Sequence, residues 1–259
     1  MFIKEARDNY WMLNWLDQFM VGHKGFICGG CFKNIFNKEK VKDLDIFFPS
    51  RTDFDDAVEY YDSKTAGYWV DGDPDCELDE DDAEYNFLYE NANVKAYIHK
   101  KTGVRIELCC KIFGTAEDIL NQFDFTITKF AYYKEEVEDE TGAEVESPFE
   151  NNIPDDLKEL VDIGIYTEEE VLAKTTNNIS THIEYKILVH NKFFEHLHMK
   201  RLVTDDKILF PMSTFERAFR YAKYGYFPCK ETKMKMARAI KGLSDEELEV
   251  SESLYDGMD

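Results

Sequence analysis

The chain has no long apolar segment and few cysteines among its 259 residues. No run of about 18 uninterrupted apolar residues occurs, so we expect no membrane-spanning helix. The first residues, MFIKEARDNYW, lack the apolar run and the small-residue cleavage site of a signal peptide. Six cysteines are too few for a disulfide scaffold of this length, and Cys109 and Cys110 are adjacent. These absences predict a cytoplasmic protein with reduced thiols.

Basic residues are also scarce, because 31 Lys and Arg stand against 53 Asp and Glu, which gives a net charge of −22. The excess of acidic over basic residues is confined to three segments. Residues 71–90 and 135–156 each hold ten acids and no base, and residues 244–259 hold seven acids and no base. Outside these segments 26 acids face 31 bases. The acidic segments are typical of solvated loops or a tail, so the net charge does not exclude a polyanionic partner.

Hydrophobic residues make up 44% of the chain and aromatics 15%, which is enough to bury a core in one large or two modest domains. In the first half, the patterns predict strands at 25–28, 44–48, 94–99 and 104–110, the last two as a hairpin, and a β-like or strand-to-helix stretch at 123–133. They predict helices at 8–20, 31–38, 53–61 and 115–122. We expect Asp8 or Asn9 to cap the first helix and Thr115 the last.

The second half has a helical pattern. We expect helices at 155–163, 167–174, 181–198, 213–225 and 230–242. Residues 186–241 carry thirteen bases and five acids with aromatics between them. Such a face would bind phosphates and stack bases, or its basic side chains would cover the edge of a core. The whole chain is therefore expected to be α+β, with a mainly helical second half.

The strongest local pattern is Gly29-Gly30 followed by Asp43-Leu44-Asp45-Ile46-Phe47. Residues i and i+2 of a strand share a face, so Asp43 and Asp45 would lie side by side. Two such carboxylates repel unless a cation or a proton intervenes, and Mg²⁺ prefers oxygen ligands together with phosphate. The glycine pair allows backbone amides to approach an anion. Taken without the glycines, the two acids are equally typical of a solvent-facing strand.

The segment from Phe26 to Phe48 resembles the hG[G/S]…DhDh signature of the DNA polymerase β-like nucleotidyltransferase superfamily. Residues 124–132 (DFTITKFAY) are similar to the DFTINALAY segment of the tRNA nucleotidyltransferase/poly(A) polymerase branch. Residues 217–226 (RAFRYAKYGY) resemble the RAxRFAxxLGF helix of that branch. Residues 123–125 (FDF) also resemble a segment of shorter phage-type nucleotidyltransferases.

This resemblance implies a polymerase-β-like catalytic domain, a small mixed sheet flanked by helices, over residues 1–134 with an acidic insertion at 64–92. An acidic linker or loop at 135–156 and a helical nucleotide- and acceptor-binding region at 157–243 would follow. Residues 244–259 would form an acidic tail. A phage-encoded protein of this kind would act in the host cytoplasm.

The resemblance also implies a metal site made by Asp43, Asp45 and a third acid from a neighbouring strand. Glu107 is our preferred third acid, although an exposed strand residue beside Arg105 would look the same. Asp124 is the competing third acid and is otherwise expected to organise or contact the nucleotide. The implied nucleotide-binding residues are Gly29, Gly30, Cys31, Lys42, Asp124, Arg217 and Arg220. Lys111 and Lys129 are further candidates for phosphate contacts, or ordinary flanking lysines.

The implied reaction moves a nucleoside monophosphate from an NTP to an acceptor hydroxyl, with Mg²⁺, or Mn²⁺ in its place, held by the carboxylates. The acceptor would be an RNA 3′ end or a protein, and no membrane is expected as a partner. Thr128 stands where the family branch has Asn, so the base selectivity of that branch does not carry over. The oligomeric state stays open.

Two other function classes remain. An inactive nucleotidyltransferase fold would act as a binding or inhibitor protein through its acidic surface, and a metal-dependent phosphodiester hydrolase would use the same acids. The retained Asp43 and Asp45 favour the active transferase. Cys28-Gly29-Gly30-Cys31 matches the CxxC pattern, but no second cysteine pair completes a zinc site, so a zinc or redox role is less favoured.

Overall fold

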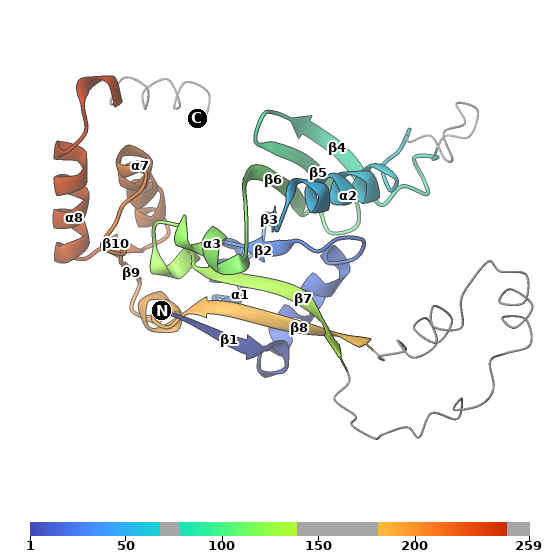
Figure 1. Cartoon of the computed structure of the whole chain (residues 1–259), viewed down its shortest axis with the longest axis horizontal. Coiled ribbons are helices and arrows are strands. Elements are labelled where there is room, and N and C mark those ends of the chain that lie inside the picture. The colour runs from blue at the N-terminus through green and yellow to red at the C-terminus, as the bar shows by residue number, and fades with distance from the viewer. Residues whose placement is uncertain (68–77, 139–180, 248–259) are drawn as a thin grey trace, which may run out of the picture. The chain divides into compact units, whose positions relative to one another are not determined.

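The computed structural model describes residues 1–67, 78–138 and 181–247, and it confirms the predicted α+β class (Figure 1). Met1–Lys134 and Tyr185–Asp259 form one compact unit, and Glu135–Glu184 form another. The expected helices at 155–163 and 167–174 lie outside the described residues, as do most of the acidic linker and most of the acidic tail. No helix in the described ranges has both the length and the apolar character needed to cross a bilayer.

An eight-stranded sheet organises the fold, in the order β1-β8-β7-β2-β3-β6-β5-β4. β3 and β6 run parallel, whereas the pairs β1–β8, β2–β3, β2–β7, β4–β5 and β5–β6 are antiparallel. The strands are β1 (Phe2–Ala6), β2 (Phe26–Cys28), β3 (Asp43–Phe48), β4 (Tyr85–Glu90), β5 (Val94–His99), β6 (Arg105–Phe113), β7 (Phe130–Glu138) and β8 (Thr181–His190). The short strands β9 (Arg201–Leu202) and β10 (Phe227–Pro228) pair separately.

Helices flank this sheet and follow it in the chain (Figure 1). They are the 3₁₀ segments η1 (Arg7–Asn9), η2 (Trp11–Phe19) and η4 (Thr126–Thr128), and the α-helices α1 (Cys31–Phe36), α2 (Arg51–Asp62), α3 (Ala116–Asn121), α6 (Phe193–His198), α7 (Pro211–Ala222) and α8 (Lys230–Lys241). Thr115 and Asp118 form a capping box at α3, with Ile119 and Leu120 fully buried. The predicted cap of this helix is therefore confirmed.

The β5–β6 hairpin is also confirmed. Its turn contains Gly103, whose φ of +68° is a left-handed conformation that favours glycine. The Gly103 amide donates to the His99 carbonyl at 2.8 Å, which closes the turn. The hairpin places β6 directly beside β3.

Three secondary-structure predictions were wrong in part. Residues 181–190, expected to begin a helix, form strand β8, because their β-branched side chains alternate and pair with β1. The predicted acidic insertion contains an aromatic-rich edge strand, β4. The predicted helix at 8–20 is a 3₁₀ helix preceded by Tyr10, not by an Asp8 or Asn9 cap. Its buried residues are Leu13, Leu16 and Phe19, a three-residue spacing that matches three residues per turn.

Candidate functional site

The two acids of β3 share one face of the central sheet. Leu44, Ile46 and Phe48 are fully buried on the opposite face, so the alternation of the strand leaves Asp43 and Asp45 together. The burial of the three apolar side chains fixes this register, because a shift of one residue would bury the acids instead.

Strand β6 brings a third acid to the pair. In the parallel β3–β6 ladder, Asp43 is opposite Arg105, and Asp45 is opposite Glu107. The carboxyl groups of Asp45 and Glu107 are close enough to share a hydrogen bond when one of them is protonated. Of the two candidates for a third acid, Glu107 is therefore the one beside Asp45.

The Asp45 carboxyl has an unusual proton affinity. Burial, the negative charge of Glu107, their shared hydrogen bond and the charge of Asp43 raise its pKa to about 7, against the opposing effect of Arg105. Buried carboxyl groups that lie close together raise one another's pKa in this way.

Arg105 provides the positive charge that the acids have in this structure. Its Nη2 lies 2.9 Å from Asp43 Oδ1, and its Nε lies 2.9 Å from Glu107 Oε1. The Tyr89 hydroxyl also donates to Glu107 Oε1, at 3.0 Å. Glu107 is thus held by two neighbours in addition to Asp45.

The donor chemistry of this cluster fits a hard divalent cation. The three carboxyls lie on neighbouring strands, and their repulsion is expressed in the raised pKa of Asp45. Nevertheless, no group of three or more His, Cys, Asp or Glu side chains within the described ranges is already arranged to hold a metal ion. Arg105 and Tyr89 both contact Oε1 of Glu107, so a cation that binds this oxygen would compete with these two contacts.

The Gly29-Gly30 turn lies against the acids. Gly29 has a φ of +93°, and a Cβ at this position would lie 3.0 Å from Phe123 and 3.5 Å from Asp45 Oδ2. A Cβ on Gly30 would lie 3.2 Å from the Tyr221 hydroxyl. The glycines therefore allow the turn to approach both a carboxylate and a side chain of α7.

A cleft of about 640 Å³ opens in front of Asp43 and Asp45. Its lining combines acidic, basic and aromatic groups: Gly30, Cys31, Lys33, Asn34, Glu39, Lys40, Lys42, Asp43, Asp45, Phe123, Asp124, Phe125, Thr128, Arg217, Arg220, Tyr221 and Tyr224. The structure thus brings most of the sequence-predicted site residues to one cleft. Gly29 and Glu107 are the two that do not line it. A Cβ on Gly29 would lie 3.5 Å from Asp45 Oδ2, and Glu107 is opposite Asp45 in the β3–β6 ladder.

Asp124 occupies a different part of the cleft from the three clustered acids. Its side chain is only 4% exposed, and its Oδ2 lies 2.7 Å from Arg217 Nε. Burial raises the pKa of Asp124, and the nearby Arg217 opposes that rise. Asp124 therefore orients Arg217 on the wall formed by α7.

Several cleft residues were not found from the sequence. Lys33 is buried and lies 3.0 Å from Glu39, with its Nζ 4.8 Å from the centre of the Tyr224 ring. Tyr221 and Tyr224 belong to the segment that resembles the family helix, yet only Arg217 and Arg220 of that segment were predicted to bind the nucleotide. The position of Lys33 on α1, one turn after Gly30, was the available signal.

Two other lysines do not reach the cleft. Lys129 is buried in an ion pair with Asp205, and Lys111 lies over the Phe210 ring at 5.3 Å. Neither lines the cleft. The suggestion that they contact phosphate was therefore wrong for this conformation, and the simpler expectation of structural lysines holds.

The Cys28–Cys31 pair has the character of core residues. Both thiols are buried and free, and the Cys31 thiol donates weakly to the Cys28 carbonyl at 3.8 Å. Burial raises the pKa of both thiols, which disfavours the reactive thiolate. These properties support the preference against a redox role.

Comparison with known proteins gives a family and a set of solved structures. CCA-adding enzymes match with 12% identity, among them complexes with CTP and with ATP, each with a TM-score of 0.49 over 92% of this chain. A Thermotoga maritima CCA-adding enzyme complexed with tRNA has a TM-score of 0.45, also at 12% identity and 92% coverage. The matches cover 45%, 46% and 46% of those chains, so this chain spans about half their length.

No curated protein sequence matches the chain. The family described as "Gad2: Gabija anti-defense 2 family protein" matches residues 6–200, which is more than half of the chain. The match includes β2, β3 and β6, and it ends before α7 and α8. The chain therefore belongs to the Gabija anti-defense 2 family.

Proposed function

We propose that this protein is a Mg²⁺-dependent nucleotidyltransferase that moves a nucleoside monophosphate from an NTP to an acceptor hydroxyl and releases pyrophosphate. The observation that carries the proposal is the cleft itself, in which Asp43 and Asp45 lie in the same space as Arg217 and Arg220. Paired acids suit a metal, and the basic side chains suit a triphosphate. The motif resemblance to polymerase-β-like nucleotidyltransferases points to the same reaction.

Asp43 and Asp45 would hold Mg²⁺, or Mn²⁺ in its place, and Glu107 would join them from β6. When bound, the metal would neutralise phosphate charge and lower the pKa of the acceptor hydroxyl. The chain itself contributes the rigid frame, because the parallel β3–β6 ladder fixes the three carboxyls relative to one another. A cation on Oε1 of Glu107 would displace Arg105 and Tyr89 from that oxygen.

The opposite wall would bind the nucleotide. A cleft of about 640 Å³ is within the usual range for small-molecule sites. Arg217, oriented by Asp124, and Arg220 would contact phosphate oxygens, with Lys42 at the edge nearest Asp43. Tyr221 and Tyr224 offer aromatic surface for a base, as does Phe123. The Gly29-Gly30 turn and Cys31 would line the side nearest the acids.

The acceptor in this proposal is an RNA 3′ end or a protein hydroxyl. The family description names an anti-defense role, so the modified molecule would be one on which the opposing defence depends. Transfer of a nucleotide to such a molecule would add a negatively charged phosphodiester at the hydroxyl that accepts it.

A second function is supported by a separate observation. Arg105 bridges Asp43 and Glu107, so the chain itself supplies a positive charge to the acids. In that case the fold would act as a binding or inhibitor protein, consistent with the family description. Its acidic surface would then contact the protein or other molecule that it binds.

An assay with labelled nucleotides separates the two functions. The purified protein is incubated with Mg²⁺, each α-labelled NTP and either short RNA or candidate protein acceptors. We expect label transfer that depends on metal and is lost in Asp43→Asn/Asp45→Asn. The matched control is Asp55→Asn/Asp56→Asn, which removes the same charge from α2, outside the cleft. No transfer and no metal-dependent NTP binding in the wild type would overturn the enzyme and leave the binding protein.

A further inference from the structure

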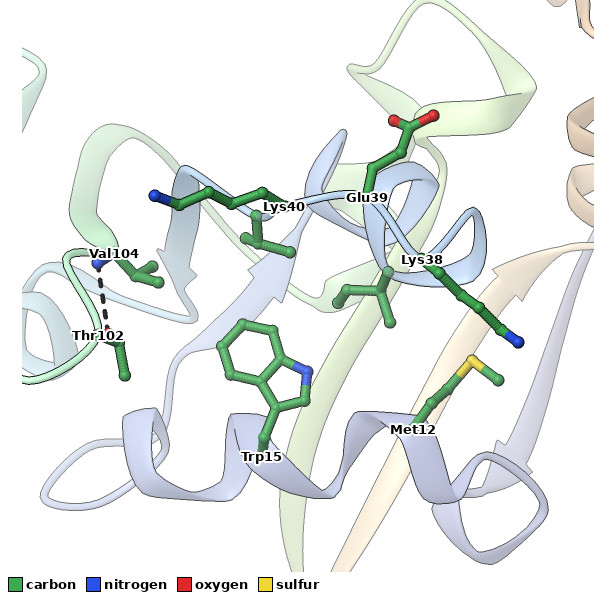
Figure 2. Close-up of a pocket in the computed structure, with 9 residues that line it drawn as sticks. Met12, Trp15, Lys38, Glu39, Lys40, Thr102 and Val104 are labelled. Carbon is green, nitrogen blue, oxygen red and sulfur yellow. Dashed lines mark hydrogen bonds between the residues drawn. The ribbon is translucent and has the colours of Figure 1, made fainter.

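A second pocket lies next to the cleft, on the other side of the loop between α1 and β3. Its volume is about 440 Å³. It is lined by Met12 and Trp15 from η2, Ile35 from α1, Lys38, Glu39, Lys40 and Val41 from the loop, and Thr102 and Val104 at the β5–β6 turn (Figure 2). None of these residues is one of the three clustered acids, and only Glu39 and Lys40 also line the cleft.

The pocket combines an aromatic floor with cationic edges. In Figure 2 the indole of Trp15 rises from η2 toward the loop, and the side chains of Lys38 and Lys40 extend to opposite sides of it. Val41 and Val104 add apolar surface, and a hydrogen bond from the Val104 amide to the Thr102 hydroxyl, at 3.3 Å, holds the turn. A planar ring would find an apolar surface here, with positive charge at its edge.

The acidic and basic side chains of the pocket differ in whether they have a charged partner. The carboxylate of Glu39 pairs with Lys33 at 3.0 Å, on the side of the main cleft. Lys38 and Lys40 are exposed, and among the described residues no ion pair or hydrogen bond is recorded for the ammonium group of either. The pocket therefore presents two available cations, and its one acid is already paired.

The loop also connects this pocket to the cleft. Glu39 and Lys40 line both spaces, and Lys42, two residues further along, lines the cleft next to Asp43. Lys38 has a φ of +58°, a left-handed conformation that is costly for a residue other than glycine. Lys38, Lys40 and Lys42 thus form a basic row from the Trp15 pocket to the carboxylates.

We propose that the Trp15 pocket binds a nucleotide of the single-stranded acceptor, with its base stacked on Trp15 and the adjoining phosphates on Lys38 and Lys40. The assignment rests on the proposed function, which it deepens by naming single-stranded nucleic acid as the acceptor class. Aromatic stacking combined with a basic track is how proteins hold single strands without reading their sequence. The strand continues over Lys42 and presents its 3′ end to the cleft.

Tryptophan fluorescence tests the pocket directly. The chain contains three tryptophans, Trp11, Trp15 and Trp69, so Trp11→Phe/Trp69→Phe leaves Trp15 as the only emitter. Trp11 is 75% exposed, which favours tolerance of its replacement. Titration with a short poly(U) RNA, in the Asp43→Asn/Asp45→Asn background and without metal, should quench Trp15. An unchanged emission at RNA concentrations that saturate binding by anisotropy would overturn the proposal.

Charge neutralisation tests the lysines. Lys38→Gln/Lys40→Gln should weaken RNA binding by about tenfold, and the slope of log affinity against log salt should become less steep by about 1.4 for two phosphate contacts on a single strand. The matched control, Lys24→Gln/Lys207→Gln, removes the same charge from exposed positions outside both pockets. Equal losses in the two double variants would overturn the assignment.

Two further comparisons distinguish a bound strand from a bound free nucleotide, and a failure of this inference from a failure of the proposed function. UMP should quench Trp15 at least about tenfold less effectively than the oligonucleotide, because it lacks the neighbouring phosphates. Equal affinity for UMP would overturn the strand in favour of a free nucleotide. RNA quenching without nucleotidyl transfer would mean that only the proposed function fails, whereas transfer without quenching would mean that only this inference fails.

Discussion

Asp45 and Glu107 are opposite each other on parallel strands, and the charge of Glu107 helps to raise the pKa of the buried Asp45 carboxyl. Asp124, the other candidate for the third acid, is instead 2.7 Å from Arg217. The two acids therefore have different electrostatic partners, and their removal should have different kinetic effects.

Glu107→Gln should lower kcat for nucleotidyl transfer by about 100-fold, because it removes a charge that would act on the reacting centre. Asp124→Asn should mainly raise KM for the NTP, by about tenfold, because the ion pair that orients Arg217 would be lost. Steady-state kinetics with varied NTP measure both. The opposite pattern, with kcat lost in Asp124→Asn alone, would exchange the proposed roles.

Arg105→Ala should tighten Mn²⁺ binding by about threefold to tenfold. The substitution removes a cation that contacts Asp43 and Glu107 and would compete with the metal. Electron paramagnetic resonance of free Mn²⁺ reports binding without any need for activity. Arg51→Ala is the control, because Arg51 pairs with Asp55 on the exposed face of α2. Weaker Mn²⁺ binding in Arg105→Ala would show that Arg105 organises the acids and does not compete.

Gly29→Ala should destabilise the protein more than Gly103→Ala does. Both glycines have positive φ, so each alanine costs about 1–2 kcal/mol in backbone strain. At Gly29 the new Cβ also lies 3.0 Å from Phe123, which adds about 1 kcal/mol or more, whereas at Gly103 nothing lies within 4 Å. Urea unfolding of the two variants measures the difference. Equal losses would mean that Phe123 moves aside without cost.

His23 should make the protein less stable in mild acid. Its ring accepts the Gly25 amide at Nδ1 and contacts the Phe19 carbonyl through Nε2, so protonation of Nδ1 would break a buried hydrogen bond. Burial lowers the pKa of His23 to about 4. The unfolded chain takes up this proton near pH 6.5 and the folded chain does not, so stability should fall between pH 6.5 and about 4.

The lowered pKa of His23 corresponds to a loss of about 3 kcal/mol in the free energy of unfolding at the acid end of that range. Urea unfolding at pH 7 and at about pH 4 would measure the loss, which should be smaller in His23→Gln by about this amount. His198→Gln, at an exposed position, should retain the full wild-type loss. A wild-type pH profile matched by His23→Gln would locate the effect elsewhere.

The carboxylate pair was predictable from the sequence because its signal is local. Alternation over residues 43–48 defines both the strand and the shared face of Asp43 and Asp45. The Gly29-Gly30 turn and the hairpin that places Glu107 were also visible as short patterns. The sequence could not choose between Glu107 and Asp124, because that choice depends on which strand becomes the neighbour of β3.

Long-range relationships account for the predictions that were wrong. Strand β8 was taken for a helix because its pairing partner, β1, lies at the other end of the chain. The ion pair of Lys129 with Asp205 joins segments with no common motif, so Lys129 was considered for phosphate. Lys38, Lys40 and Lys42 have the two-residue spacing of a strand but precede β3, and only the fold shows that they border two pockets.

The place of β8 in the sheet also has a consequence for synthesis of the protein. Phe2–Ala6 pair with Lys186–His190, and β8 also separates β1 from β7. During synthesis, β1 therefore cannot pair until β8 has emerged from the ribosome. Pairing between such distant segments slows folding. Until then, β7 has an open edge that another nascent chain could pair with. A product that stops at Lys134 would keep that edge permanently, so premature termination there should give aggregates.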